Sequence, residues 1–235
     1  MNKILVKNSD SLITVPDGTE VFILDQSTNY LKIEIGSNCV INYIGILKNS
    51  CDREIIIGDN SIINISSLYL SAGQFKINNY LGKEVVLNSQ VLAYGQQEQV
   101  LQIEDNYIFK GPASTGKIIA SALADNLSTI NYLSDVVIKP EASQTETRID
   151  MKLYLLNSRA KGLMLPGLKI ATNNVKAGHG ASTSQLTAED LFYLSSRGLT
   201  DNQSKRLVID SILKKFLINI SDPETKDLIS SLITL

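Results

Sequence analysis

The stretch Ile35-Gly36-Ser37-Asn38-Cys39-Val40-Ile41-Asn42 recurs 22 residues later as Ile57-Gly58-Asp59-Asn60-Ser61-Ile62-Ile63-Asn64. A third copy, Leu81-Gly82-Lys83-Glu84-Val85-Val86-Leu87-Asn88, follows, and a looser one, Gly18-Thr19-Glu20-Val21-Phe22-Ile23, precedes them. The shared pattern is an aliphatic residue, glycine, a spacer, asparagine or glutamate, a second spacer, two aliphatic residues and, in most copies, asparagine. Repeats of this length indicate a solenoid, in which each coil covers the hydrophobic face of its neighbour.

The chemistry of the repeat favours a short β-strand in each coil. Glycine is expected to supply a turn conformation with positive φ, and the aliphatic pair suits a buried strand. The asparagine is expected to bond the backbone at the next corner or to stack on the asparagine one coil away. The pattern therefore predicts a mainly β fold, a parallel β-helix. An antiparallel meander is the alternative, but only Asp17-Gly18 provides its tight hairpin signal.

The periodicity changes near residue 187. Before it, strand-like segments continue the solenoid: Val100–Ile103, Tyr107–Lys110, Lys117–Ala120, Val136–Ile138, Lys152–Leu156 and Leu168–Ala171. After it, three short helices are predicted, the first ending at Arg197-Gly198 with a C′ glycine, the second opening with a Thr200/Gln203 capping box, and the third starting at Ser221 with Glu224 and ending near Leu235. We expect two parts: a parallel β-helix over residues 1–186 and a small C-terminal α-helical subdomain over 187–235.

Composition limits the chemistry. The 235 residues include one His, two Cys and no Trp. Zinc sites need about four ligands, and Cys39 and Cys51 have no CxxC partner, so a self-contained zinc or iron–sulfur site is nearly excluded. With 22 basic and 24 acidic residues, the chain lacks the basic surplus that nucleic-acid binding requires. No apolar run suits a signal peptide or a membrane span, so we expect a cytoplasmic protein with no membrane contact.

One segment resembles a known family. Val175-Lys176-Ala177-Gly178-His179-Gly180-Ala181, followed by Leu191-Phe192-Tyr193-Leu194-Ser195-Ser196-Arg197-Gly198-Leu199, is similar to the C-terminal core signature of the SufB/SufD proteins of the SUF iron–sulfur assembly system. Upstream elements also match that pattern: Phe109-Lys110-Gly111, Ala142 with Thr145, Leu155–Ala160 and Pro166–Ile170. The resemblance covers about residues 105–218 and suggests a short SufD-like member.

The resemblance implies a right-handed β-helix and a non-catalytic scaffold role. Such a scaffold pairs through its β-helix, with a second copy or a SufB-like paralogue, and docks a SufC-type ABC ATPase through its C-terminal helices. It also implicates His179 in assembling a transient iron–sulfur cluster shared with the partner chain. Two departures stand against cluster binding: Ala177 occupies the motif cysteine, and no cysteine lies near Ala160–Lys161. Family members are also longer, and the sequence leaves open whether the short N-terminus is natural.

Single residues keep more than one interpretation. His179 is either a shared ligand or a turn histidine that bonds the backbone between two glycines. Cys39 occupies the repeat position held by Ser61 and is expected to pack, whereas Cys51 is expected to be exposed in a polar turn between coils. The apolar run of Leu191, Phe192, Tyr193 and Leu194 either caps the open end of the β-helix or, with Arg197, forms a partner-binding patch. We interpret Gly111–Lys117 as a loop between strands and not as a phosphate-binding loop, because Ile118 follows Lys117 where that motif requires Ser or Thr.

Two other functions remain. One is a structural β-solenoid that keeps partner binding but has lost cluster chemistry, which the missing motif cysteine keeps open. The other is a carbohydrate-active β-helix enzyme, which the low aromatic content, 6%, and the lack of a signal peptide disfavour.

Overall fold

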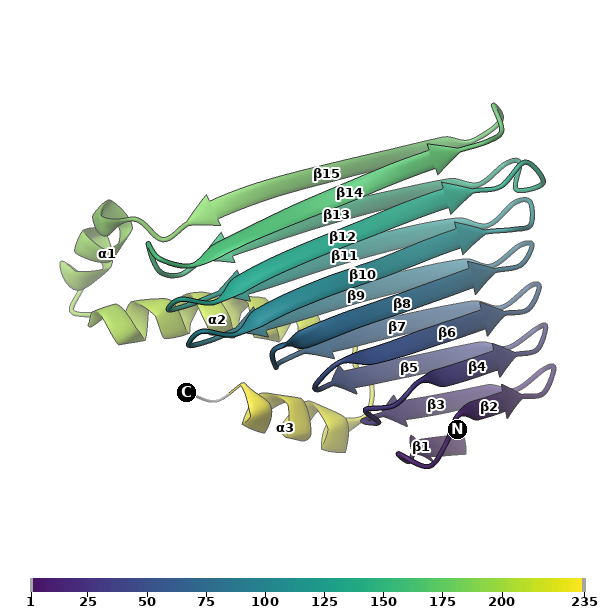
Figure 1. Ribbon diagram of the computed structural model, residues 1–235, viewed down its shortest axis with the longest axis horizontal. Helices are drawn as coiled ribbons and strands as arrows, with labels where there is room; N and C mark the ends of the chain where they lie inside the picture. Colours follow the sequence, from purple (N-terminus) through teal and green to yellow (C-terminus); the bar gives the residue numbers. More distant parts are fainter. Residues whose placement is uncertain (1, 234–235) are drawn as a thin grey trace.

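The computed structural model describes residues 2–233 as two parallel β-sheets wound into a flattened solenoid, accompanied by three C-terminal helices (Figure 1). The eight-stranded sheet contains, in spatial order, β1 (Asn2–Val6), β3 (Glu20–Asp25), β5 (Val40–Leu47), β7 (Ile62–Tyr69), β9 (Val86–Gly95), β11 (Thr115–Ala124), β13 (Glu146–Leu155) and β15 (Lys176–Gln185). The seven-stranded sheet contains β2 (Leu12–Val15), β4 (Leu31–Ile35), β6 (Cys51–Ile57), β8 (Gly73–Leu81), β10 (Val100–Phe109), β12 (Thr129–Ile138) and β14 (Lys161–Ile170). Consecutive strands alternate between the sheets, so the predicted mainly β, parallel solenoid is confirmed.

In the three close copies the repeat glycine serves a different purpose from the one predicted, whereas Gly18 of the looser copy has the predicted positive φ (69°). Positive φ occurs two residues later, at Asn38 (58°) and Asn60 (55°), and not at Gly36 or Gly58. A Cβ on Gly58 would lie 2.5 Å from the carbonyl carbon of Gly36, one coil away. The glycine is therefore needed because two backbones approach closely at this corner, and asparagine, which tolerates the left-handed region, makes the turn.

The predicted asparagine stacking is confirmed. Asn42, Asn64 and Asn88 occupy equivalent positions in β5, β7 and β9. The Asn64 amide donates to Asn42 Oδ1 at 2.9 Å, and the Asn88 amide donates to Asn64 Oδ1 at 3.1 Å. This ladder runs along the outer face of the eight-stranded sheet and fixes the register between successive coils.

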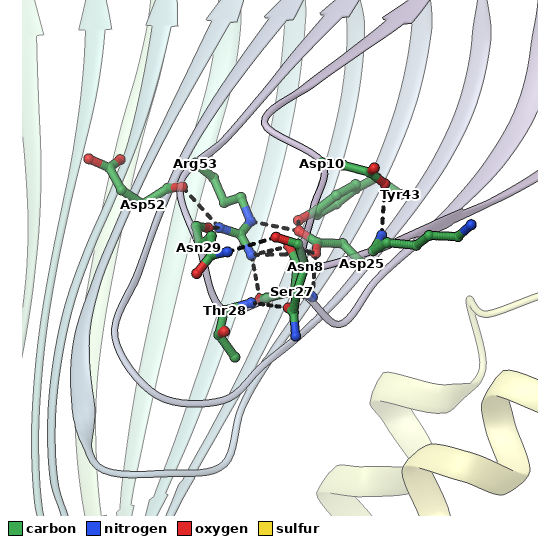
Figure 2. Close-up of polar contacts among 10 residues, drawn as sticks. Asn8, Asp10, Asp25, Ser27, Thr28, Asn29, Tyr43, Asp52 and Arg53 are labelled. Atoms are coloured by element: carbon green, nitrogen blue, oxygen red, sulfur yellow. Dashed lines mark hydrogen bonds and ion pairs between the residues drawn. The ribbon is translucent and has the colours of Figure 1, made fainter.

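The interior is mostly aliphatic and aromatic, yet it encloses a buried ion pair, two residues from Cys51 (Figure 2). Arg53 Nε donates to Asp25 Oδ2 at 2.6 Å, and both side chains are fully buried. Tyr43 donates its hydroxyl to Asp25 Oδ2 at 2.8 Å, and the guanidinium also donates to the carbonyl oxygens of Ser27, at 2.6 Å, and Asn29. These bonds meet the requirement that buried charges be paired.

The predicted helix starts are mostly confirmed. Helix α1 (Ala188–Ser195) begins with a Thr187/Asp190 capping box, and α2 (Asp201–Leu217) begins with the predicted Thr200/Gln203 box. Gly198, after α1, has the positive φ (85°) expected of a C′ glycine. Helix α3 (Pro223–Leu232) is capped by Asp222 and not by Ser221, because Pro223 lies at the first helical position and the N-cap is the residue before it. The predicted end near Leu235 lies outside the described residues.

Helices α2 and α3 pack along the outer face of the eight-stranded sheet and leave the end of the solenoid uncovered (Figure 1). One buried cluster joins Ile209, Ile212, Leu213 and Phe216 of α2 and Ile229 of α3 to Phe22, Leu24, Ile44, Ile46, Leu68 and Leu92 of β3, β5, β7 and β9. Helix α1 buries none of its residues. Of the two interpretations of the Leu191–Leu194 run, capping of the last coil is therefore wrong. The helices that pack on the solenoid do so on the outer face of the eight-stranded sheet, where the strands present a second apolar surface.

Candidate functional site

The last coil of the solenoid ends in two sheet edges, β15 and β14, that no other described strand covers. In β15, Lys176 N donates to Thr145 O, and after the strand Leu186 N donates to Leu155 O. Backbone amides alternate sides along a strand, so those of the odd-numbered residues from Ala177 to Gln185 face the free edge. The edge is therefore a row of open backbone donors and acceptors.

The β14 edge is less suited to pairing. Lys161 N and Ala171 N donate to the backbone of the preceding coil, so the even-numbered residues of β14 face outward. One of them is Pro166, which has no N–H, and proline is confined to such edge positions in sheets. The unbroken donor row belongs to β15 alone.

His179 lies in the middle of β15 and not in a turn, which corrects that interpretation of the sequence. Its neighbour in β13 is Ile149, which is fully buried inside the solenoid, so the imidazole occupies an interior-facing position of the uncovered last coil. Its Nδ1 lies 3.1 Å from the carbonyl oxygen of Pro166 in β14, so the side chain links the two sheets. A carbonyl only accepts, so Nδ1 donates in this contact, and in the neutral tautomer that fits it Nε2 keeps its lone pair.

The two cysteines lie elsewhere. Cys39 is buried as predicted, but Cys51 is the first residue of β6 and only 7% exposed, so the expected exposed turn is wrong. Burial raises the pKa of the Cys51 thiol to about 11, which disfavours the reactive thiolate. Within residues 2–233, no three side chains among His, Cys, Asp and Glu lie close enough to hold a metal ion. His179 thus stands as a single donor at the open end.

Helix α1 presents the other residues that the sequence singled out. Phe192 and Tyr193 are 74% and 59% exposed, and the Arg197 guanidinium lies over the Tyr193 ring at 5.3 Å from its centroid. Leu191 and Leu194 are partly exposed. An exposed aromatic pair with a stacked arginine has the composition of a protein-binding patch. His179 and these residues belong to separate elements, β15 and the α1 region.

Comparison with known proteins shows the family of the chain. The family described as "SUF system FeS cluster assembly, SufBD core domain" matches residues 30–212, which is most of the chain. The chain belongs to the SufBD family. The match runs from β4 into α2, and so it includes both the last coil with His179 and helix α1.

Several curated relatives carry SufBD names. An iron–sulfur cluster assembly SufBD family protein of Synechocystis is 40% identical over 122 residues, which is 52% of this chain and 27% of the relative. A Mycobacterium tuberculosis protein of the same description is 30% identical over 131 residues (55% and 32%), and the SufD protein of Bacillus subtilis is 27% identical over 135 residues (57% and 31%). The chain spans about a third of the length of these relatives.

The SufBD motifs have a clear structural placement. The Ala142/Thr145 element is a buried turn in which the Thr145 hydroxyl donates to the Ala142 carbonyl at 2.8 Å. The Pro166–Ile170 element is the second half of β14, facing His179. Sequence reasoning missed β15 as a strand because Ala, Gly and Ser dominate it and Thr183 is its only β-branched residue. In the described part of the chain, no helix is long and apolar enough to cross a membrane.

Proposed function

We propose that this SufBD chain is a non-catalytic scaffold subunit of a SUF-type iron–sulfur cluster assembly complex. Family membership supports a role in cluster assembly, with the cluster as cargo, and the observation that carries the scaffold role is the open β15 edge with His179 beside it. Pairing through this edge would extend the sheet into a second chain and satisfy the free backbone groups.

Small side chains favour such pairing. Ala177, Gly178, Gly180 and Ala181 flank His179 along β15, so another strand could approach closely without steric conflict. The partner is a second copy or a SufB-like paralogue. In either case Nε2 of His179 would supply one ligand atom, and the partner would supply the thiolates, since the cysteines of this chain are buried several coils away.

The pairing test uses proline. Ala181→Pro removes one outward N–H of β15 without removing a hydrogen bond to β13, so the fold should persist while pairing weakens. The measurement is sedimentation velocity of the chain alone and with a SufB-like paralogue. Thr183→Ala, on the same strand and with its N–H intact, is the matched control. Unchanged association of the Ala181→Pro variant would exclude pairing through this edge.

The cluster test uses the lone histidine. The chain is purified anaerobically with a SufB-like partner and a SufC-type ATPase, and bound iron and sulfide are measured. We expect His179→Ala to retain the complex but lower its iron and sulfide content, whereas Thr183→Ala should not. If the complex forms and its iron content is the same without His179, the chain is the structural solenoid that has lost cluster chemistry. That alternative is favoured by Ala177 at the motif cysteine.

ATPase docking is assigned to the patch on α1: Leu191, Phe192, Tyr193 and Arg197. Phe192→Ala should weaken binding of a SufC-type ATPase roughly tenfold or more, as expected for an aromatic anchor. Ile218→Ala is the matched control. Ile218 is also a large exposed apolar residue (77%), but it follows the C-terminal end of α2, whereas α1 precedes the N-terminal end of that helix. Equal binding by both variants and the unmodified chain would refute docking through α1.

A further inference from the structure

A groove lies between the outer face of the eight-stranded sheet and helix α2, on the side of the solenoid and not at its open end. Its volume is about 480 Å³, which is within the ~300–1,000 Å³ range of small-molecule sites. Strands β7, β9, β11 and β13 form one wall, and α2 with the residues that follow it forms the other. The scaffold role proposed above does not use this groove.

The groove is held open by a defined set of hydrogen bonds. Gln90, on β9, donates through its amide to Ser66 Oγ at 2.8 Å and to the Phe216 carbonyl at 2.9 Å. Its Oε1 accepts from the Asn219 amide at 3.0 Å. One side chain thus ties the sheet to α2, so the cavity is formed before any ligand arrives, which lowers the cost of binding.

The charge in the groove is one-sided. Lys117 on β11 and Lys215 on α2 line opposite walls, and none of the described lining residues is an aspartate or glutamate. Neither lysine forms an ion pair with any residue from 2 to 233. Two carboxylates of the neighbouring strand β13 are engaged elsewhere, since Asp150 pairs with Arg148 at 2.7 Å and Glu146 with Lys176 at 2.6 Å.

The remaining lining is apolar and rich in amides. Ile119, 44% exposed, and Tyr154, whose ring centroid lies 4.8 Å from the Lys152 ammonium, line the sheet side, and Phe216, 5% exposed, lines the α2 side. The asparagine ladder reaches Asn88, and Lys117 occupies the equivalent position in the next coil. A ring placed here would contact apolar surface on its faces and amide groups at its edge.

We propose that this groove binds an organic monophosphate with a flat ring, of nucleoside monophosphate size. The phosphate, close to a dianion at neutral pH, would lie between Lys117 and Lys215, which are two separate point charges. The ring would rest against Ile119, Tyr154 and Phe216, with its edge toward Asn88 and Asn219. A free nucleotide and the nucleotide end of a larger molecule would both satisfy this chemistry.

The test is calorimetric titration of the whole chain with adenosine monophosphate. We expect a Kd below about 1 mM, weaker binding of inorganic phosphate, and no measurable binding of adenosine. Lys117→Gln and Lys215→Gln should each weaken nucleotide binding roughly tenfold, the effect of losing one charge-assisted bond. Lys214→Gln is the matched control, because it removes a charge from the adjacent residue of α2, which does not line the groove.

A second readout locates the ligand. The side-chain amide resonances of Asn88, Gln90 and Asn219 should shift on titration, and circular dichroism should show that the variants remain folded. The proposal is overturned by any of three results: no binding at about 10 mM nucleotide, equal binding by the unmodified chain and both groove variants, or a loss in Lys214→Gln as large as in Lys215→Gln.

Discussion

Replacing Arg53 by methionine tests whether the buried ion pair of the early coils holds the solenoid together (Figure 2). Methionine keeps the length and apolar stem of the side chain but removes the guanidinium. Asp25 would keep its bonds from the Tyr43 hydroxyl, at 2.8 Å, and from the backbone amide and hydroxyl of Ser27, at 2.9 and 2.6 Å. It would lose its only counter-charge within the described residues.

The size of the effect follows from full burial. An exposed pair contributes about 0–1 kcal/mol, whereas removing one partner of a buried pair costs about 3–5 kcal/mol, because a charge is left uncompensated. The carbonyl oxygens of Ser27 and Asn29 also lose their donor. We therefore expect the free energy of unfolding to fall by about 3–5 kcal/mol. For a chain of this size the melting temperature should fall by about 6–20 °C.

The assay is urea unfolding followed by far-UV circular dichroism for Arg53→Met, Asp25→Asn and the double variant. The double variant should recover roughly 2 kcal/mol relative to the sum of the single losses, because it leaves no unpaired charge. Lys32→Met, which breaks an exposed pair with Glu34 in the preceding coil of the same sheet, is the matched control. An Arg53→Met loss below about 1 kcal/mol, or strict additivity in the double variant, would show that burial does not make this pair important.

Three further perturbations test the interior. Burial raises the pKa of Asp105 to about 6, so the folded state binds its proton more tightly than the unfolded chain does. The contribution of Asp105 to stability should be full below about pH 4, fall by about 3 kcal/mol as pH rises to about 6 and then level off. Comparison of the melting curves with those of Asp105→Asn should isolate this fall. Gly58→Ala should lower the free energy of unfolding several-fold more than Gly18→Ala does. A Cβ added at Gly18 has no atom within 4 Å, so that variant should cost only about 1 kcal/mol, through the φ of 69°. Equal urea midpoints for the two variants would contradict the close-approach argument. Thiol reagents should label Cys39 and Cys51 slowly in the folded chain and rapidly in urea, and rapid labelling of the folded chain would disprove their burial.

The repeat made the solenoid predictable because it acts at short range. Each copy specifies its own corner and strand, and the Asn42–Asn64–Asn88 ladder links copies through identical side chains, which a search for repeats detects directly. The same reasoning did not predict the strand β15. Its backbone is ordered by the ladder to β13 and not by its own side chains, so local propensity carried no signal.

Long-range partners account for the other errors. The segment with Cys51 was expected to be an exposed turn, and its burial depends on the neighbouring Arg53, whose partner Asp25 lies 28 positions earlier where no spacing rule connects the two. The position of the helices was predictable in part: Val21–Leu24 is a continuous apolar run, buried on both faces in β3, which indicates a strand covered from outside as well as inside. A strand with alternating apolar and polar residues buries only one face, whereas this continuous run buries both. The run was therefore the sequence signal that a helical layer covers the outer face of the sheet.

The sideways placement of α2 and α3 has a consequence for the proposed scaffold. Because these helices use the face of the eight-stranded sheet, the edge of β15 and the patch on α1 both remain open. Pairing and ATPase docking would then be energetically independent, since sites without shared contacts give additive effects. Ala181→Pro and Phe192→Ala should each impair one association and leave the other unchanged. A loss of ATPase binding in the Ala181→Pro variant would mean instead that the ATPase recognises the paired assembly, and that α1 is completed by the partner chain.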